Sequence, residues 1–108
     1  MTVEKFAEKY GYEILCIPDP ERVISDGYAG DLLSWVMGRL TEGSAWITIM
    51  SNINIVAVAT LSDPSCIILS EGVDLDDGVV DKALQQGVNI LRTQKDTFSA
   101  CADVKASL

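Results

Sequence analysis

The sequence predicts an α/β domain: a mostly parallel sheet of about five strands with helices on its faces. From residue 29 onward, segments with helical apolar spacing alternate with short runs rich in β-branched residues. Residues 66–70 are almost continuously apolar, which is typical of a strand covered on both faces. Such alternation indicates parallel strands joined by right-handed crossovers. A chain of 108 residues has room for one domain, so we assign residues 1–108 to a single unit.

The first elements are a helix and two strands. Within residues 3–10, apolar side chains recur at i, i+3, i+4 and i+7, and Gly11 suits the position after a helix. Residues 12–17 form an apolar run that two nearby prolines close, so we expect a strand there. A second short strand is expected over residues 22–26.

A glycine-containing loop is expected next, over residues 27–30. Asp31 is a suitable N-cap for a helix over residues 32–40, whose apolar residues form one stripe. Trp35 lies off that stripe, which makes it a candidate for a protein contact. A third strand follows at residues 45–50.

Residues 52–61 fit two structures. Helical spacing and strand alternation match the apolar residues almost equally well, but polar residues bracket the segment and Asn52 can cap a helix. We therefore predict a helix. Because a helix that is apolar on most sides is either buried or at a subunit contact, Ile55 and Val58 are candidate interface residues beside Trp35.

The last third continues the alternation. An acidic loop over residues 74–78 starts a helix that ends at Gly87, and a strand follows at residues 88–91. Either Thr93 or Asp96 then caps a final helix.

The charge of the chain limits its partners. Sixteen acidic residues against eight basic ones give a net charge of −8, and no basic cluster offsets it. Nucleic acid and anionic membrane surfaces are therefore excluded as expected partners. No apolar run reaches the ~18–20 residues that a membrane-spanning helix needs. The first residues lack the basic and apolar segments of a signal peptide, so we expect a cytoplasmic protein.

Three cysteines, Cys16, Cys66 and Cys101, form no close pair. Cys16 and Cys66 lie in apolar runs, where a free cysteine behaves as a small hydrophobic residue. The absence of a disulfide pattern agrees with a reducing compartment.

The sequence lacks the usual catalytic signatures. It contains no histidine, which removes the commonest general base and metal ligand, and no glycine-rich phosphate loop. The acidic residues near Asp76 lack the spacing of a calcium loop. We therefore expect no enzyme activity, no metal and no cofactor. An enzyme that uses carboxylates alone, such as Asp26 with Asp31, would need a metal or a raised carboxyl pKa.

Candidate binding residues follow the expected strand ends, because ligands of parallel α/β folds meet the carboxyl ends of the strands. Small, polar or acidic residues gather there, and these are also common turn formers. The candidate ligand residues are Asp26, Gly27, Gly30, Asn52, Glu71 and Thr93.

Four blocks of the chain, residues 23–33, 46–49, 54–59 and 67–72, resemble a DRTGG-type domain such as the N-terminal domain of HPr kinase/phosphorylase. The resemblance implies a three-layer α/β/α domain. It also implies a role in regulation or subunit association, since relatives accompany the catalytic domain of HPr kinase, CBS-domain pyrophosphatases and some phosphotransacetylases. Residues 51–54 lack the Asp-Arg signature of those relatives, and the sequence carries no kinase domain.

These observations support two hypotheses of function. The first is a non-catalytic regulatory or scaffold domain that forms a homodimer and contacts an unidentified partner protein. The alternative is a domain that binds a small metabolite, such as a nucleotide or a phosphorylated compound, at the carboxyl ends of the strands.

Overall fold

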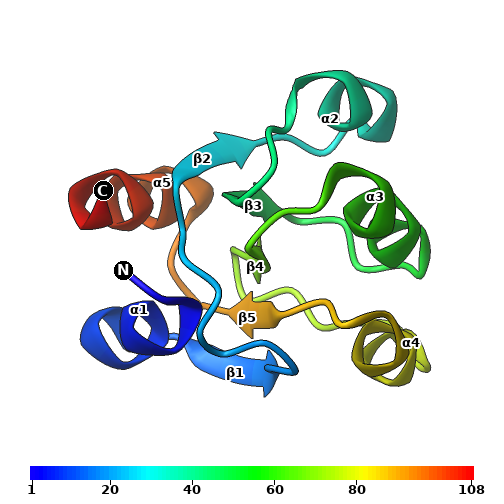
Figure 1. The fold of residues 1–108 in the computed structure, drawn as a ribbon, viewed down its shortest axis with the longest axis horizontal. Coiled ribbons are helices and arrows are strands. Elements are labelled where there is room, and N and C mark those ends of the chain that lie inside the picture. The colour runs from blue at the N-terminus through cyan, green and yellow to red at the C-terminus, as the bar shows by residue number, and fades with distance from the viewer.

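The computed structural model describes residues 1–108, which form one five-stranded sheet between two layers of helices (Figure 1). The strand order is β1-β5-β4-β3-β2. Strands β2 to β5 pair in parallel, and β1 pairs with β5 in the antiparallel sense. The prediction of a mostly parallel α/β fold is confirmed. The strands are β1 (Glu13–Cys16), β2 (Asp26–Ala29), β3 (Ser44–Thr48), β4 (Cys66–Leu69) and β5 (Ile90–Arg92).

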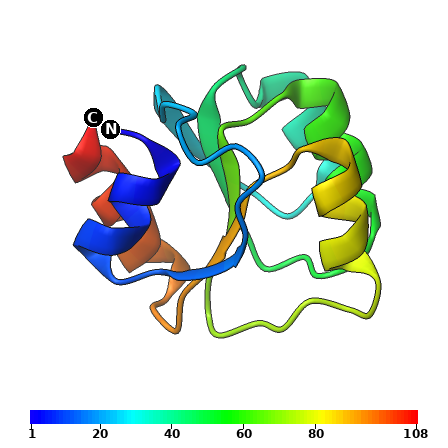
Figure 2. The same ribbon diagram turned by 60° about the horizontal axis from the view of Figure 1, so that its bottom comes forward.

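Helices cover both faces of the sheet, as Figures 1 and 2 show. One face carries the first and last helices, and the other carries the three helices between parallel strands. The three-layer arrangement implied by the family resemblance is therefore confirmed. The helices are α1 (Val3–Tyr10) and α5 (Thr97–Ser107) on one face, and α2 (Leu33–Arg39), α3 (Asn54–Ser62) and α4 (Val79–Gln86) on the other.

The core is divided by the sheet into two apolar clusters. Every residue of β4 is buried, and its side chains alternate between the clusters: Ile67 and Leu69 pack toward α2, α3 and α4, while Cys66 and Ile68 pack toward α1 and α5. A strand that is buried on both faces is what the apolar run at residues 66–70 predicted. Cys16 is buried as well, and Cys101 is less so, as expected.

Helix α3 corrects one prediction and confirms another. The helix predicted over residues 52–61 is present as α3. However, Ile55 and Val58, which were candidate interface residues, are only 0 % and 5 % exposed. Both face the sheet within the domain's own core, so they cannot contact a second protein in this fold. The large apolar residues exposed at this helix are Leu61, near its end, and Ile53, just before its first residue.

Strand β2 lies later in the chain than predicted. Residues 22–25 form no strand apart from an isolated bridge between Val23 and Thr2, and the segment 27–29, expected as a loop, belongs to β2. Pairing along β3, from Asp26 opposite Ser44 to Ala29 opposite Ile47, outweighs the low strand propensity of glycine.

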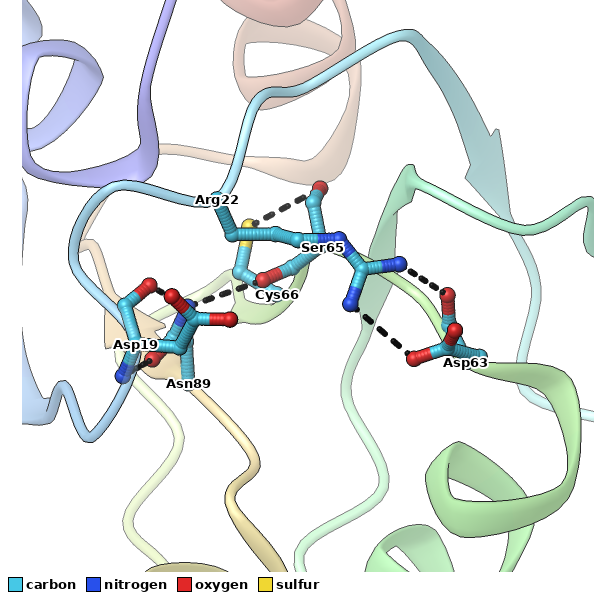
Figure 3. A network of polar contacts seen from close by, with 6 residues as sticks. All are labelled: Asp19, Arg22, Asp63, Ser65, Cys66 and Asn89. Carbon is cyan, nitrogen blue, oxygen red and sulfur yellow. Dashed lines mark hydrogen bonds and ion pairs between the residues drawn. The ribbon is translucent and has the colours of Figure 1, made fainter.

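The segment that connects β1 to β2 crosses the amino ends of β4 and β5, where polar contacts hold it (Figure 3). The Asn89 side chain accepts a hydrogen bond from the backbone N–H of Asp19 at 2.9 Å and donates to the carbonyls of Asp19 and Ser65. Arg22 forms an ion pair with Asp63 at 3.0 Å. This network therefore joins three separate segments, the β1–β2, α3–β4 and α4–β5 connections, at the end of the sheet opposite the predicted ligand site.

Candidate functional site

The six candidate ligand residues do not form one site. Gly30, Asn52, Glu71 and Thr93 follow the carboxyl ends of β2 to β5, as predicted. Asp26 and Gly27 instead start β2 and lie at the other end of that strand, because β2 begins at Asp26. The expected pocket is thus divided between two regions of the molecule.

Asp31 ties the loop after β2 to the end of β3. Its carboxylate accepts hydrogen bonds from the Thr48 hydroxyl at 2.8 Å and from the backbone N–H of Ile49 at 2.9 Å. The predicted N-cap role is wrong, because Leu32 occupies the N-cap position of α2 and Asp31 makes these longer-range bonds instead. The neighbouring carbonyl of Gly30 accepts from the indole N–H of Trp46 at 2.9 Å. Both residues are therefore engaged inside the fold.

The side chain of Glu71, in the loop after β4, lies beside the first residue of α5. Its carboxylate accepts a hydrogen bond from the backbone N–H of Thr97 at 2.8 Å, and Asp96 caps the same helix by accepting from Ser99 N–H at 2.7 Å. That backbone hydrogen bond from Ser99 lowers the pKa of Asp96. Of the two predicted caps, Asp96 is confirmed, and Thr93 Oγ1 accepts from Lys95 N–H instead. An anion at this helix end would have to displace two carboxylates.

Asn52 lies two residues before α3. Its side-chain oxygen accepts a hydrogen bond from the backbone N–H of Asn54 at 2.9 Å. The predicted capping role is wrong, because Ile53 occupies the N-cap position of α3. The adjacent Ser51 is joined to Asp76 by a hydroxyl–carboxylate contact of 3.2 Å and a backbone hydrogen bond of 3.0 Å. The loops after β3 and β4 are thereby linked.

The cations near Thr93 are already paired. Arg92 contacts Glu13 at 3.0 Å and Asp74 at 2.7 Å, and Lys95 contacts Asp103 at 2.7 Å. These cations border a small polar cavity of about 280 Å³. Every charge that a bound phosphate could use there is thus neutralised by the protein.

Asp103 also accepts a hydrogen bond from the Tyr12 hydroxyl at 2.9 Å. Burial, followed by this contact with Asp103, raises the pKa of Tyr12. The Lys95 ammonium lies 5.2 Å from the centre of the Tyr12 ring. The three side chains thus link the α1–β1 connection, the β5–α5 loop and α5.

The largest cavity, about 410 Å³, lies between β2 and α5. Eight of its 11 lining residues are hydrophobic, so it is an apolar groove. Asp26 and Gly27 line it, whereas the other four candidate ligand residues do not. The sequence analysis missed this groove because it assigned residues 27–30 to a loop. We call it the β2–α5 groove; it is lined by Asp26, Gly27, Tyr28, Ala29, Ile47, Phe98, Cys101, Ala102, Val104, Lys105 and Leu108.

Helix α2 exposes a second apolar surface. Leu32, Trp35 and Met37 are all more than half exposed, and only Val36 of the helix is fully buried. The Arg39 guanidinium stacks 3.7 Å from the centre of the Trp35 ring. Trp35 is thus on the surface, as its position off the apolar stripe predicted.

No group of three or more Cys, Asp or Glu residues is placed to hold a metal ion. None of the helices combines the length and apolar character needed to cross a membrane.

Comparison with known proteins found a solved structure with a similar fold. A crystal structure of the CBS and DRTGG domains of the regulatory region of Clostridium perfringens pyrophosphatase, complexed with the activator diadenosine tetraphosphate, matches with a TM-score of 0.77. The match covers 99 % of this chain and 47 % of that one at 16 % identity, so it establishes similarity of fold. This chain thus spans less than half of that structure. No curated protein matches. Residues 29–107 match the model of the DRTGG domain, and the chain therefore belongs to the DRTGG domain family.

Proposed function

We propose that this DRTGG domain is a non-catalytic regulatory or scaffold module that self-associates and contacts a partner protein. The observation that carries the proposal is the exposed apolar surface of α2. Trp35 is 54 % exposed, and Leu32, at the N-cap position three residues earlier on the same side of the helix, is 59 % exposed. Tryptophan and arginine, here stacked as Trp35 and Arg39, are the residue types that most often dominate binding energy at protein interfaces.

The engagement of the polar residues supports a non-catalytic role. A catalytic carboxylate needs to face the substrate, yet Asp31, Glu71 and Asp96 each accept hydrogen bonds from groups of the fold itself. The related domain of the clostridial enzyme occurs in a regulatory region, which agrees with a regulatory role for this chain.

The test combines light scattering with capture of partners. Wild-type protein is expected to show a mass that rises with concentration and to retain a specific protein from a lysate of its own source. Trp35→Glu should lose that protein, while Leu84→Glu, on the exposed face of α4 at a similar exposure, should retain it. A protein that is monomeric at every concentration and retains nothing would contradict the proposal.

The alternative is a domain that binds a nucleotide or phosphorylated metabolite beside Gly30, Asn52, Glu71 and Thr93. The nucleotide activator in the related regulatory region favours it. A ligand at about one hundred times its Kd stabilises a protein by ~2.7 kcal/mol, which thermal denaturation detects readily. If no compound in a panel of nucleotides and sugar phosphates raises Tm, this alternative fails.

A further inference from the structure

The two edges of the sheet differ in how they are protected. At one edge, the register of β1 shifts between Ile14 and Cys16, and Glu13 is held in an ion pair with Arg92. Bulges and charges are the common devices that prevent an edge strand from pairing with another chain. At the other edge, β2 pairs with β3 through all four residues without a shift. Of the two edge strands, only β2 therefore pairs with its neighbour without a shift in register.

The outward-facing backbone groups of β2 can be identified. Gly30 N–H donates to the Ile47 carbonyl at 3.1 Å, and hydrogen-bonding residues alternate along a strand. Ala29 and Gly27 therefore direct their N–H and C=O groups away from β3. The Gly27 N–H is occupied by the carboxylate of Asp26 at 2.8 Å, so Asp26 partly shields this edge.

The β2–α5 groove runs beside this edge. On the β2 side of the groove, Gly27 and Ala29 present almost no side chain. On the α5 side, Phe98 is 83 % exposed and Leu108 is 53 % exposed. An exposed strand edge next to an apolar groove is the arrangement used in recognition by strand addition: main-chain hydrogen bonds supply affinity and apolar side chains fill the groove.

The distribution of charge indicates which occupant fits. The chain carries a net charge of −8, so most of its surface repels a second copy. The groove has only two charged residues, Asp26 and Lys105, which are of opposite sign. A basic partner would instead be attracted to exposed acidic residues such as Asp77 and Asp81.

We propose that a second copy of this chain docks here, with the two β2 strands paired antiparallel about a two-fold axis. Because the outward-facing residues must bond to each other, Gly27 of one copy pairs with Ala29 of the other, and Tyr28 faces its own counterpart. The two sheets become one ten-stranded sheet, and Phe98 of each copy covers the joint. This inference rests on the self-association in the proposed function and assigns it to β2, which leaves the exposed surface of α2 for the partner protein. The contact is small, so the dimer is concentration-dependent.

Sedimentation velocity over a wide concentration range tests the proposal with three variants of the full chain. Phe98→Glu should weaken the dimer about tenfold or more, as expected for loss of an aromatic interface residue. Glu in the first turn of α5 suits the helix dipole, so the fold is retained. Leu61→Glu is the matched control: its side chain is 73 % exposed on α3, and it should leave the dimer unchanged. Asp26→Ala removes the shielding carboxylate and should tighten the dimer several-fold.

Amide hydrogen exchange supplies a readout specific to strand pairing. The Ala29 N–H should exchange slowly at concentrations where the dimer forms and quickly in Phe98→Glu. A dimer that survives Phe98→Glu, or in which the Ala29 amide stays unprotected, would overturn the β2 surface while leaving self-association intact. A protein that is monomeric at every concentration would overturn both.

Discussion

The backbone of Asp19 is held by the side chain of Asn89, 70 residues later in the chain, through hydrogen bonds of 2.9 and 2.7 Å (Figure 3). Asn89 is 2 % exposed and also donates to the carbonyl of Ser65 at 3.0 Å. Both donors and the oxygen of one amide thus fasten the β1–β2 connection to the amino ends of β4 and β5. No local signal in the sequence reveals this contact, because its partners are brought together only by the sheet.

Replacing Asn89 with Ala should lower the free energy of unfolding by about 3 kcal/mol, because buried backbone groups lose their partners. Arg22→Ala removes the neighbouring ion pair with Asp63, whose side chains are 28 % and 55 % exposed, and should cost no more than about 1 kcal/mol. Urea denaturation of the two variants measures both values. Equal losses would show that the exposed ion pair contributes as much to holding this segment as the buried amide does.

Asp31→Ala should destabilise the domain by about 1–3 kcal/mol. The carboxylate is the acceptor for the hydroxyl of Thr48, which is 1 % exposed, and a buried donor left without a partner carries its full desolvation cost. Asp77→Ala, at an exposed acidic position, is the control and should stay close to wild type. If both variants unfold at the same urea concentration, Asp31 does not hold the β2–α2 loop to β3.

Gly27 and Gly38 should respond to alanine in opposite directions. A Cβ at Gly27 would lie 2.8 Å from Val104 Cγ1, so Gly27→Ala forces α5 away from β2 and should cost about 1–3 kcal/mol. A Cβ at Gly38 meets nothing within 4 Å, and alanine in a helix is favoured over glycine by ~1 kcal/mol. Thermal denaturation should therefore show a lower Tm for Gly27→Ala and a higher Tm for Gly38→Ala.

The clash between a Cβ at position 27 and Val104 can be relieved by shortening Val104. In the double variant Gly27→Ala/Val104→Ala, the smaller side chain on α5 makes room for the new Cβ, so the combined loss should be smaller than the sum of the two single losses. Strictly additive losses would mean that Gly27 is required for a reason other than its close approach to α5.

The elements with local signals were predicted correctly from the sequence. Helix α1 has apolar residues on one face and ends at Gly11, whose φ is 75°, and β4 is a continuous apolar run. Strand β2 was misplaced because its stability comes from pairing with β3 and from the close approach of α5 rather than from strand-forming residues. Ile55 and Val58 were assigned to an interface because a helix apolar on most sides does not reveal which side meets the sheet.

The candidate site was predictable only as far as the ends of the strands. Four of the six residues do lie at the expected edge, but the hydrogen bonds that engage two of them join distant segments: Glu71 to Thr97 and Gly30 to Trp46. A sequence pattern indicates that a carboxylate follows a strand. It does not indicate whether that carboxylate faces a ligand or a neighbouring loop.

The stability of the domain should fall between pH ~9 and ~12, and Cys66 should account for part of the fall. Burial raises the pKa of the Cys66 thiol to about 12, from 9.0 in an exposed thiol. As pH rises through this window, the thiol of the unfolded chain ionises while that of the native chain stays protonated. The unfolded state then binds fewer protons, so the free energy of unfolding decreases, by at most ~1.4 kcal/mol per pH unit for this group.

Comparison with Cys66→Ala isolates that contribution. Below pH 9 the variant should be the less stable protein, because it leaves a small cavity in the core beneath α1 and α5. Its stability should then decline less steeply with pH, so that the difference from wild type narrows toward pH 12. Tyr12 contributes to the decline of both proteins, because its raised pKa acts in the same direction above pH 10. Parallel curves for wild type and Cys66→Ala would mean that the thiol of Cys66 ionises as readily in the native domain as in the unfolded chain.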